Sequence, residues 1–153
     1  MKPHSHLWIL LFPLVLAIGC GDGRPRAYPV SGKVVFEDGE IVQFGDVEFF
    51  NEEFKMNANG KIAKDGTFKL TTYGDDDGAI TGKHKVVIIQ RTRNHMTAQI
   101  EGMINHDHGD LIDRKYFDYR TSKLTAEIQP IELNEIELTV KRMPDKEQAA
   151  ADH

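Results

Sequence analysis

The chain of 153 residues is poor in the side chains that usually act as nucleophiles. It has one cysteine, Cys20, and beyond that position its only serines are Ser31 and Ser122. Neither serine stands in the G-x-S-x-G turn that exposes a catalytic hydroxyl in hydrolases, and no H-E-x-x-H zinc helix occurs. These scarcities argue against an enzyme, although a pair of carboxylates that meets only in three dimensions would leave no trace in the sequence.

The sequence also has neither a run of basic residues nor an apolar run long enough to span a bilayer. Leu7 to Ile18 are twelve consecutive residues without charge, the length of the apolar part of an export signal and too short for a transmembrane helix. From Cys20 onward 18 lysines and arginines stand against 24 aspartates and glutamates, a net charge of about −6. This acidic balance argues against nucleic acid as a partner.

The only cysteine, Cys20, stands directly where the apolar run stops. The sequence Ala17-Ile18-Gly19-Cys20 ends the apolar run, with small residues before a thiol. It resembles the lipobox of bacterial lipoproteins, which implies diacylglyceryl transfer to the Cys20 sulfur and cleavage after Gly19. Two acyl chains are enough for stable membrane attachment. The alternatives, an ordinary secreted protein or a cytosolic chain with a buried N-terminal helix, leave an unexplained free thiol.

The sequence therefore divides into four parts. Residues 1–19 are the expected signal peptide and residues 20–29 the acylated cysteine with a Gly- and Pro-rich tether. Residues 30–142 are the expected folded domain. Residues 143–153 contain Pro144, alanines and charges with nothing apolar to bury, so they are expected to form a disordered tail.

Apolar residues alternate with polar ones through most of the domain, which is the pattern of strands with one solvated face. The turn Asp65-Gly66 predicts a hairpin that joins GKIAK to TFKLTT, and the unbroken run H-K-V-V-I-I at 84–89 predicts a central strand. Residues 124–128 and 136–140 alternate in the same way and predict a final antiparallel pair. About seven strands predict an all-β antiparallel sandwich, interrupted by one long insert without strands from Arg91 to Thr121.

Three stretches of the domain occur in an order typical of one family: VSGKVVFEDGE with GDVEFF, KDGTFKLTT with TGKHKVVI, and LIDRKYFDYRTSKLTAEI. Together they resemble small bacterial lipoproteins whose domain is related to carboxypeptidase regulatory-like and transthyretin-like modules. The resemblance covers about residues 30–140. It implies a seven-stranded prealbumin-like sandwich whose strand-end loops are available for binding, and it transfers no catalytic residue.

The insert contains the most metal-like motif of the chain. His106 and His108 are two residues apart, so both imidazoles can point the same way on an extended backbone and bind a transition metal such as zinc. Asp107, Asp110 and the more distant His95 are the further candidate ligands, because catalytic zinc usually has three protein ligands. The alternative interpretation is a solvated polar loop.

Two other clusters have a structural and a functional interpretation. Asp75, Asp76 and Asp77 can attract calcium, but they lack the alternating spacing of a calcium loop and are more typical of a solvated turn. An aromatic cluster with Arg114 beside it offers a flat surface for a sugar or peptide, although its rings more often anchor such a segment to the sandwich. Its rings are Tyr116, Phe117 and Tyr119.

These observations predict a noncatalytic lipoprotein of the cell envelope that needs no cofactor. Its sandwich is expected to bind an envelope protein or a surface polysaccharide, and acylated Cys20 to hold it to a membrane. A metal- or small-ligand-binding lipoprotein that uses His106 and His108 is the alternative.

Overall fold

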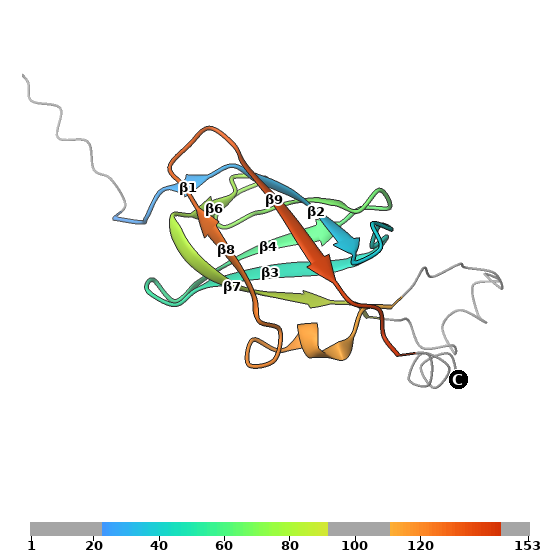
Figure 1. The fold of residues 1–153 in the computed structure, drawn as a ribbon. Helices are drawn as coiled ribbons and strands as arrows, with labels where there is room; N and C mark the ends of the chain where they lie inside the picture. The colour runs from blue at the N-terminus through green and yellow to red at the C-terminus, as the bar shows by residue number, and fades with distance from the viewer. Residues whose placement is uncertain (1–22, 92–110, 145–153) are drawn as a thin grey trace, which may run out of the picture.

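The computed structural model describes residues 23–91 and 111–144 and shows an all-β protein (Figure 1). In this part of the chain the only helical element is a short 3-10 helix, η1 (Arg114–Phe117). The strands, in chain order, are β1 (Ala27–Tyr28), β2 (Val30–Phe36), β3 (Gly45–Asn51), β4 (Met56–Ile62), β5 (Thr67–Lys69), β6 (Ala79–Ile80), β7 (Gly82–Ile89), β8 (Leu124–Ile128) and β9 (Asn134–Val140).

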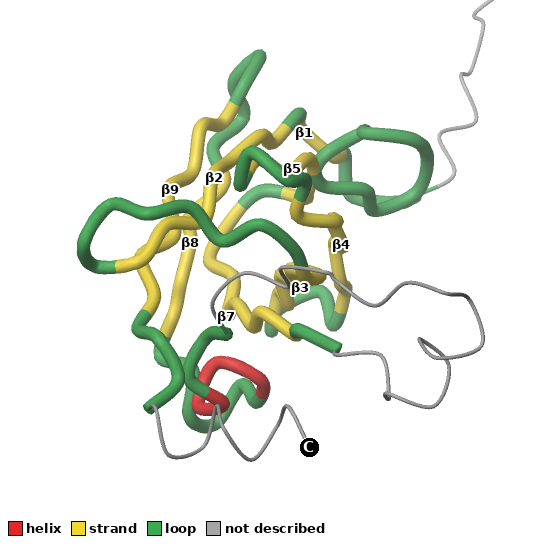
Figure 2. The backbone as a smooth tube through the Cα atoms, turned by 90° about the vertical axis from the view of Figure 1, so that its right-hand side faces the viewer, coloured by secondary structure: helices red, strands yellow, loops and turns green. Residues whose placement is uncertain are grey.

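Seven of these strands form two sheets that enclose one core, which confirms the predicted β-sandwich. One sheet has the order β5-β2-β9 and the other β4-β3-β7-β8, while β1 and β6 form a separate short pair. All pairs are antiparallel except β2 and β9, which run parallel from Val30 opposite Asn134 to Phe36 opposite Val140. Figure 2 shows the tube of the same strands after a quarter turn, with η1 in red beside β7.

The alternating residues of the strands build the core, as their pattern predicts. Val34 and Phe36 of β2 and Val47 and Phe49 of β3 are at most 2% exposed. Gly32 faces the same core, but a Cβ atom there would lie 2.3 Å from Cζ of Phe68 and 2.4 Å from the Ile136 carbonyl oxygen. The absence of a side chain at Gly32 therefore leaves room for the Phe68 ring, which contacts Phe49 at 5.9 Å between centroids.

The run at 84–89 lies in β7, and its prediction as a central strand is confirmed. β7 pairs with β3 on one side and β8 on the other. Val86, Val87 and Ile88 are consecutive and buried, so both faces of the strand are covered at this point. η1 packs against β7 and contributes to this cover.

The predicted hairpin at Asp65-Gly66 is confirmed for its turn and forms only in part for its pairing. Gly66 donates its N–H to the Ala63 carbonyl and has the positive φ of 80° that such a turn requires. The two arms are joined by the Ala63 N–H, which donates to the Thr67 carbonyl at 2.8 Å, and by an antiparallel bridge between Asn59 and Thr71. Their longer ladders lie in different sheets, since β4 pairs with β3 and β5 pairs with β2. Pairing with β2 places the Phe68 ring over Gly32, where it fills the core.

The predicted final antiparallel pair is wrong, although both of its strands exist. β8 pairs with β7 and β9 pairs with β2, so the chain crosses from one sheet to the other between them. The crossing is the corner 129–134. There the Asn134 side chain accepts the Gln129 N–H at 2.9 Å and donates to the Gln129 carbonyl at 3.0 Å.

The ordered structure reaches slightly beyond residues 30–142. β1 pairs with β6 before the expected start, and Met143 is buried, donating its N–H to the Leu111 carbonyl.

Candidate functional site

A polar groove crosses the outer face of the four-stranded sheet, with a volume of about 410 Å³. Asp46 stands opposite Lys61 on one side and Ile89 on the other, and Glu48 stands opposite Asn59. The alternation of β3 produces this arrangement, because Val47 and Phe49 point into the core and the acidic residues that alternate with them, Asp46 and Glu48, point outward. The groove is lined by Asp46, Val47, Glu48, Asn59, Gly60, Lys61, Ile89 and Arg91.

Glu48 connects the groove to the aromatic cluster of the insert. Its Oε1 accepts hydrogen bonds from the Tyr119 hydroxyl and from Asn57 Nδ2, both at 2.7 Å. Burial, and then the neighbouring Glu48 carboxylate, raises the pKa of the Tyr119 phenol. Tyr119 therefore remains a neutral donor at all ordinary pH values and holds Glu48 in place.

The Tyr119 ring forms an aromatic edge beside this carboxylate. It contacts Phe50 of β3 at 5.6 Å between centroids, with an interplanar angle of 48°. Lys55 places its Nζ 5.9 Å from the centroid of the Phe50 ring. The edge thus combines flat apolar area with a cation, next to a groove that carries charges of both signs.

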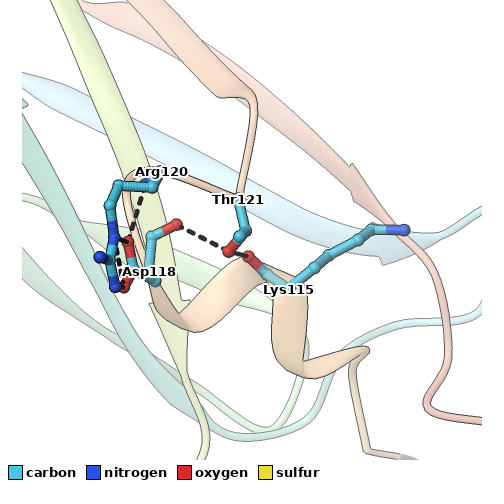
Figure 3. A network of polar contacts seen from close by, with 4 residues as sticks. All are labelled: Lys115, Asp118, Arg120 and Thr121. Atoms are coloured by element: carbon cyan, nitrogen blue, oxygen red, sulfur yellow. Dashed lines mark hydrogen bonds and ion pairs between the residues drawn. The ribbon is translucent and has the colours of Figure 1, made fainter.

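A compact polar network holds the segment that carries Tyr119 (Figure 3). Thr121 Oγ1 donates to the Lys115 carbonyl at 2.6 Å, which closes the loop after η1. Arg120 forms an ion pair with Asp118 at 2.6 Å, and the hydrogen bonds from Arg120 lower the pKa of Asp118 to about 2. Ser122 then donates its hydroxyl to the Val86 carbonyl, which fastens the segment to β7.

The other residues of the predicted binding surface lie apart from the groove. Tyr116 is buried, and its Oη accepts the Lys141 N–H at 3.1 Å, so it anchors the segment to the end of β9. Phe117 is half-buried and packs against the core, while Arg114 is exposed. The structure thus favours an anchoring role for Tyr116 and Phe117, and a direct binding role for the cluster stays a prediction.

A buried amide joins the residues on the two sides of 92–110. The Gln90 side chain donates to the Phe44 carbonyl at 3.1 Å and accepts the Ile112 N–H at 2.8 Å. Gln90, the residue before the insert, is thereby joined to Ile112, which forms an antiparallel bridge with Arg142. Arg91 leaves the sheet at the groove itself.

The predicted metal ligands His95, His106, Asp107, His108 and Asp110 lie outside the described residues, as does Cys20. In residues 23–91 and 111–144 no group of three or more His, Cys, Asp or Glu side chains is arranged to hold a metal ion. Zinc binding stays a prediction. If it is right, calorimetric titration of the protein with zinc shows a saturable signal that a His106→Ala, His108→Ala double variant abolishes.

The acidic turn at 75–77 has a structural explanation. The Asp77 carboxylate accepts the backbone N–H groups of Thr72 at 2.7 Å, Tyr73 at 3.0 Å and Gly74 at 3.1 Å. Asp76 forms an ion pair with Lys69 at 3.2 Å. Two of the three acids thus shape the turn and its contact with β5.

Sequence reasoning did not identify the groove residues on β3 and β4. The outward positions of GDVEFF show that Asp46 and Glu48 share a face, but no pattern shows that Asn59 and Lys61 lie beside them. That information comes from strand order and register.

Comparisons with protein-family models, with curated proteins and with solved structures find no significant match to this chain. Within the described part of the chain, no helix has the length and apolar character needed to cross a membrane.

Proposed function

We propose that this protein is a noncatalytic, lipid-anchored lipoprotein of the cell envelope whose groove binds an envelope protein or a surface polymer. In this proposal acylated Cys20 holds the protein to a membrane, and the domain is of the carboxypeptidase regulatory-like, transthyretin-like kind. The lipobox-like sequence and the β-sandwich support it. Binding requires no cofactor.

The observation that carries the binding function is the contact of the groove with the insert, because Arg91, its first residue, lines the groove and Tyr119, near its end, donates to Glu48 there. The sheet holds acidic and basic side chains next to each other in the groove, and Glu48 accepts two hydrogen bonds that fix its carboxylate. The Tyr119 and Phe50 rings supply an aromatic edge. A shallow groove of this kind suits an extended polymer with many hydroxyl or amide groups, because each repeat offers the same donors and acceptors.

A pull-down from detergent-solubilised envelope tests the proposal, with the acylated protein as bait and Cys20→Ser protein as the unlipidated control. We expect the same partner with both baits and a loss of capture of about tenfold for a Lys61→Glu, Arg91→Glu double variant, because it reverses both groove cations. The matched control is Lys33→Glu on the outer face of the other sheet. Equal capture by both variants, or no enriched protein or polysaccharide, contradicts the proposal.

A further inference from the structure

The exposed large apolar side chains of the described residues all lie at one end of the sandwich. Two belong to the corner between β8 and β9, one to the turn between β3 and β4, and one to the loop before β6. They are Ile131 (51% exposed), Leu133 (46%), Phe54 (45%) and Tyr73 (38%). Single exposed apolar residues are common, but four at one end and, in residues 23–91 and 111–144, none at the other indicate a contact surface.

Strand register shows that these features share one end. Asn51 pairs with Met56 and with His84, so the turn that carries Phe54 lies next to the start of β7. At that start Gly82 pairs with Ile128, just before the corner that carries Ile131 and Leu133. In Figure 1 this end is on the left, where the described chain begins. We call it the anchor end.

The chain entering from its N-terminus is fastened to this end. β1 pairs with β6, and the Pro29 carbonyl accepts the Asn134 N–H of the corner at 2.9 Å. The Tyr73 hydroxyl donates to the Pro25 carbonyl at 2.9 Å, and the Arg24 guanidinium lies 5.7 Å from the centroid of its ring. Cys20 is three residues before Gly23, a reach of at most about 10 Å even when fully extended.

The corner presents its apolar residues on a well-braced support. Asn134 is buried and bonds through its side chain to both backbone groups of Gln129. The Ile131 N–H also donates to the Gln129 carbonyl at 2.9 Å. Ile131 and Leu133 thus project from a short turn whose base is closed by hydrogen bonds. The turn keeps both apolar side chains exposed to water, and its rigidity gives no conformational entropy that would offset this exposure.

We propose that the anchor end docks against the lipid bilayer, with Ile131 and Leu133 entering its interfacial region. The inference rests on the proposed acylation of Cys20, which brings Gly23 to within about 10 Å of the lipid. The charged residues of the corner and its flanks are acidic, with Glu132 between the two apolar residues and Glu135 just after them, so apolar burial drives the contact rather than attraction to anionic lipid. Docking points the opposite end, where Asp46, Lys61 and Arg91 line the groove, away from the membrane.

The fluorescence of one introduced tryptophan reports this contact without background. The only tryptophan of the chain, Trp8, precedes Cys20 and is removed with the proposed signal peptide. The acylated protein with Leu133→Trp is reconstituted into phosphatidylcholine vesicles that contain a lipid brominated on its acyl chains. We expect a blue-shifted emission that the brominated lipid quenches. The matched control is Lys64→Trp in the exposed turn at the other end, which we expect to stay unquenched.

Three other results contradict the docking proposal. Equal emission and quenching of the two variants in protein that floats with the vesicles means that the domain is tethered but undocked. A blue shift that appears without vesicles and rises with protein concentration means that a second copy covers the corner. Docking that requires anionic lipid means that charge, not apolar burial, drives the contact.

An unlipidated variant separates this proposal from the anchor itself. Mass spectrometry of the mature protein first shows whether Cys20 carries diacylglycerol, and its absence contradicts the proposed anchor. In Cys20→Ser protein, an Ile131→Ser, Leu133→Ser double substitution is expected to lower partitioning into vesicles by about tenfold, with no change in melting temperature. Unchanged partitioning contradicts docking while leaving acylation intact.

Discussion

Gly32 is a residue whose role depends on a missing side chain. A Cβ atom at this position would overlap the Phe68 ring and the Ile136 carbonyl, at 2.3 and 2.4 Å. We expect Gly32→Ala to lower the free energy of unfolding by about 1–3 kcal/mol, because the ring must shift within a filled core. Urea unfolding measures the change. Gly74→Ala is the control, since nothing lies within 4 Å of its added Cβ, and an equal loss in both variants would refute this explanation.

His84 makes stability depend on pH through its burial. It lies in the core against Phe49, at 6.2 Å between ring centroids, with Nδ1 3.0 Å from the Gly82 carbonyl. Desolvation by burial lowers the pKa of His84 below its ordinary value of 6.5. Below pH 6.5 the unfolded chain thus binds a proton that the folded chain does not, and stability falls as the pH decreases.

We expect the free energy of unfolding to decrease as the pH falls from 7.5 through 6.5, and a His84→Gln variant to show a smaller decrease. Denaturant titrations at a series of pH values measure both slopes. Equal slopes in the two proteins would assign the pH dependence to other groups.

At the scale of the element, the alternating pattern identified the strands but not their partners. Phe68 and Leu70 mark β5 correctly, because one face of any strand must be apolar to pack on a core. The short connection at Asp65-Gly66 does join a partial hairpin through the bridge between Asn59 and Thr71. The longer ladder of β5 is with β2, where its Phe68 ring meets the space left by Gly32. Such complementarity between distant residues has no local signal.

Pairing between distant strands also explains why some residues of the candidate site could not be predicted from the sequence. The insert and its aromatic cluster were visible as an irregular stretch with rings, and Tyr119 does lie at the groove. Lys61 and Asn59 were invisible as site residues because their places depend on the register of β4 against β3. The acidic turn was ambiguous until Asp77 was seen to accept three backbone N–H groups.

At the corner between β8 and β9, where the chain crosses from one sheet to the other, the Asn134 side chain supplies the stabilising hydrogen bonds. Asn134 satisfies both the N–H and the carbonyl of Gln129. We expect Asn134→Ala to reduce the free energy of unfolding by about 1–3 kcal/mol, because buried partners lose their hydrogen bonds. Asn134→Asp keeps the acceptor but places a carboxylate oxygen where Nδ2 donates to the Gln129 and Pro29 carbonyls, so at neutral pH it should lose at least as much. Thermal and urea denaturation compare the three proteins, and an Asn134→Ala variant as stable as the unchanged protein would contradict this role of the side chain.

At the scale of the whole molecule, the sandwich places its two proposed contacts at opposite ends. β3 runs from Gly45, beside the groove, to Asn51, next to the turn that carries Phe54. A domain docked through Ile131 and Leu133 would therefore present the groove, with Arg91 and Tyr119 of the insert beside it, to the surrounding envelope. This separation lets one rigid body contact lipid and partner at the same time.

The closeness of the insert's ends predicts that the fold does not need residues 92–110. Gln90 and Ile112 are already joined by a 2.8 Å hydrogen bond, and all strands of the two sheets lie in the described residues. Replacing 92–110 with a short Gly-Ser linker is expected to leave the melting temperature unchanged or slightly higher, because halving a loop saves only about 0.6 kcal/mol of closure entropy.

Calorimetry and circular dichroism measure this outcome against the intact chain, and the pull-down then reports binding in the same variant. Retained melting with lost capture assigns partner recognition to the insert together with the groove, whereas retained capture assigns it to the groove alone. A Gln90→Ala version of the shortened chain is the matched comparison and should melt lower, since the Ile112 N–H and the Phe44 carbonyl then lose their partner. If the shortened chain with Gln90 intact already fails to unfold cooperatively, the insert supplies part of the core and the prediction is wrong.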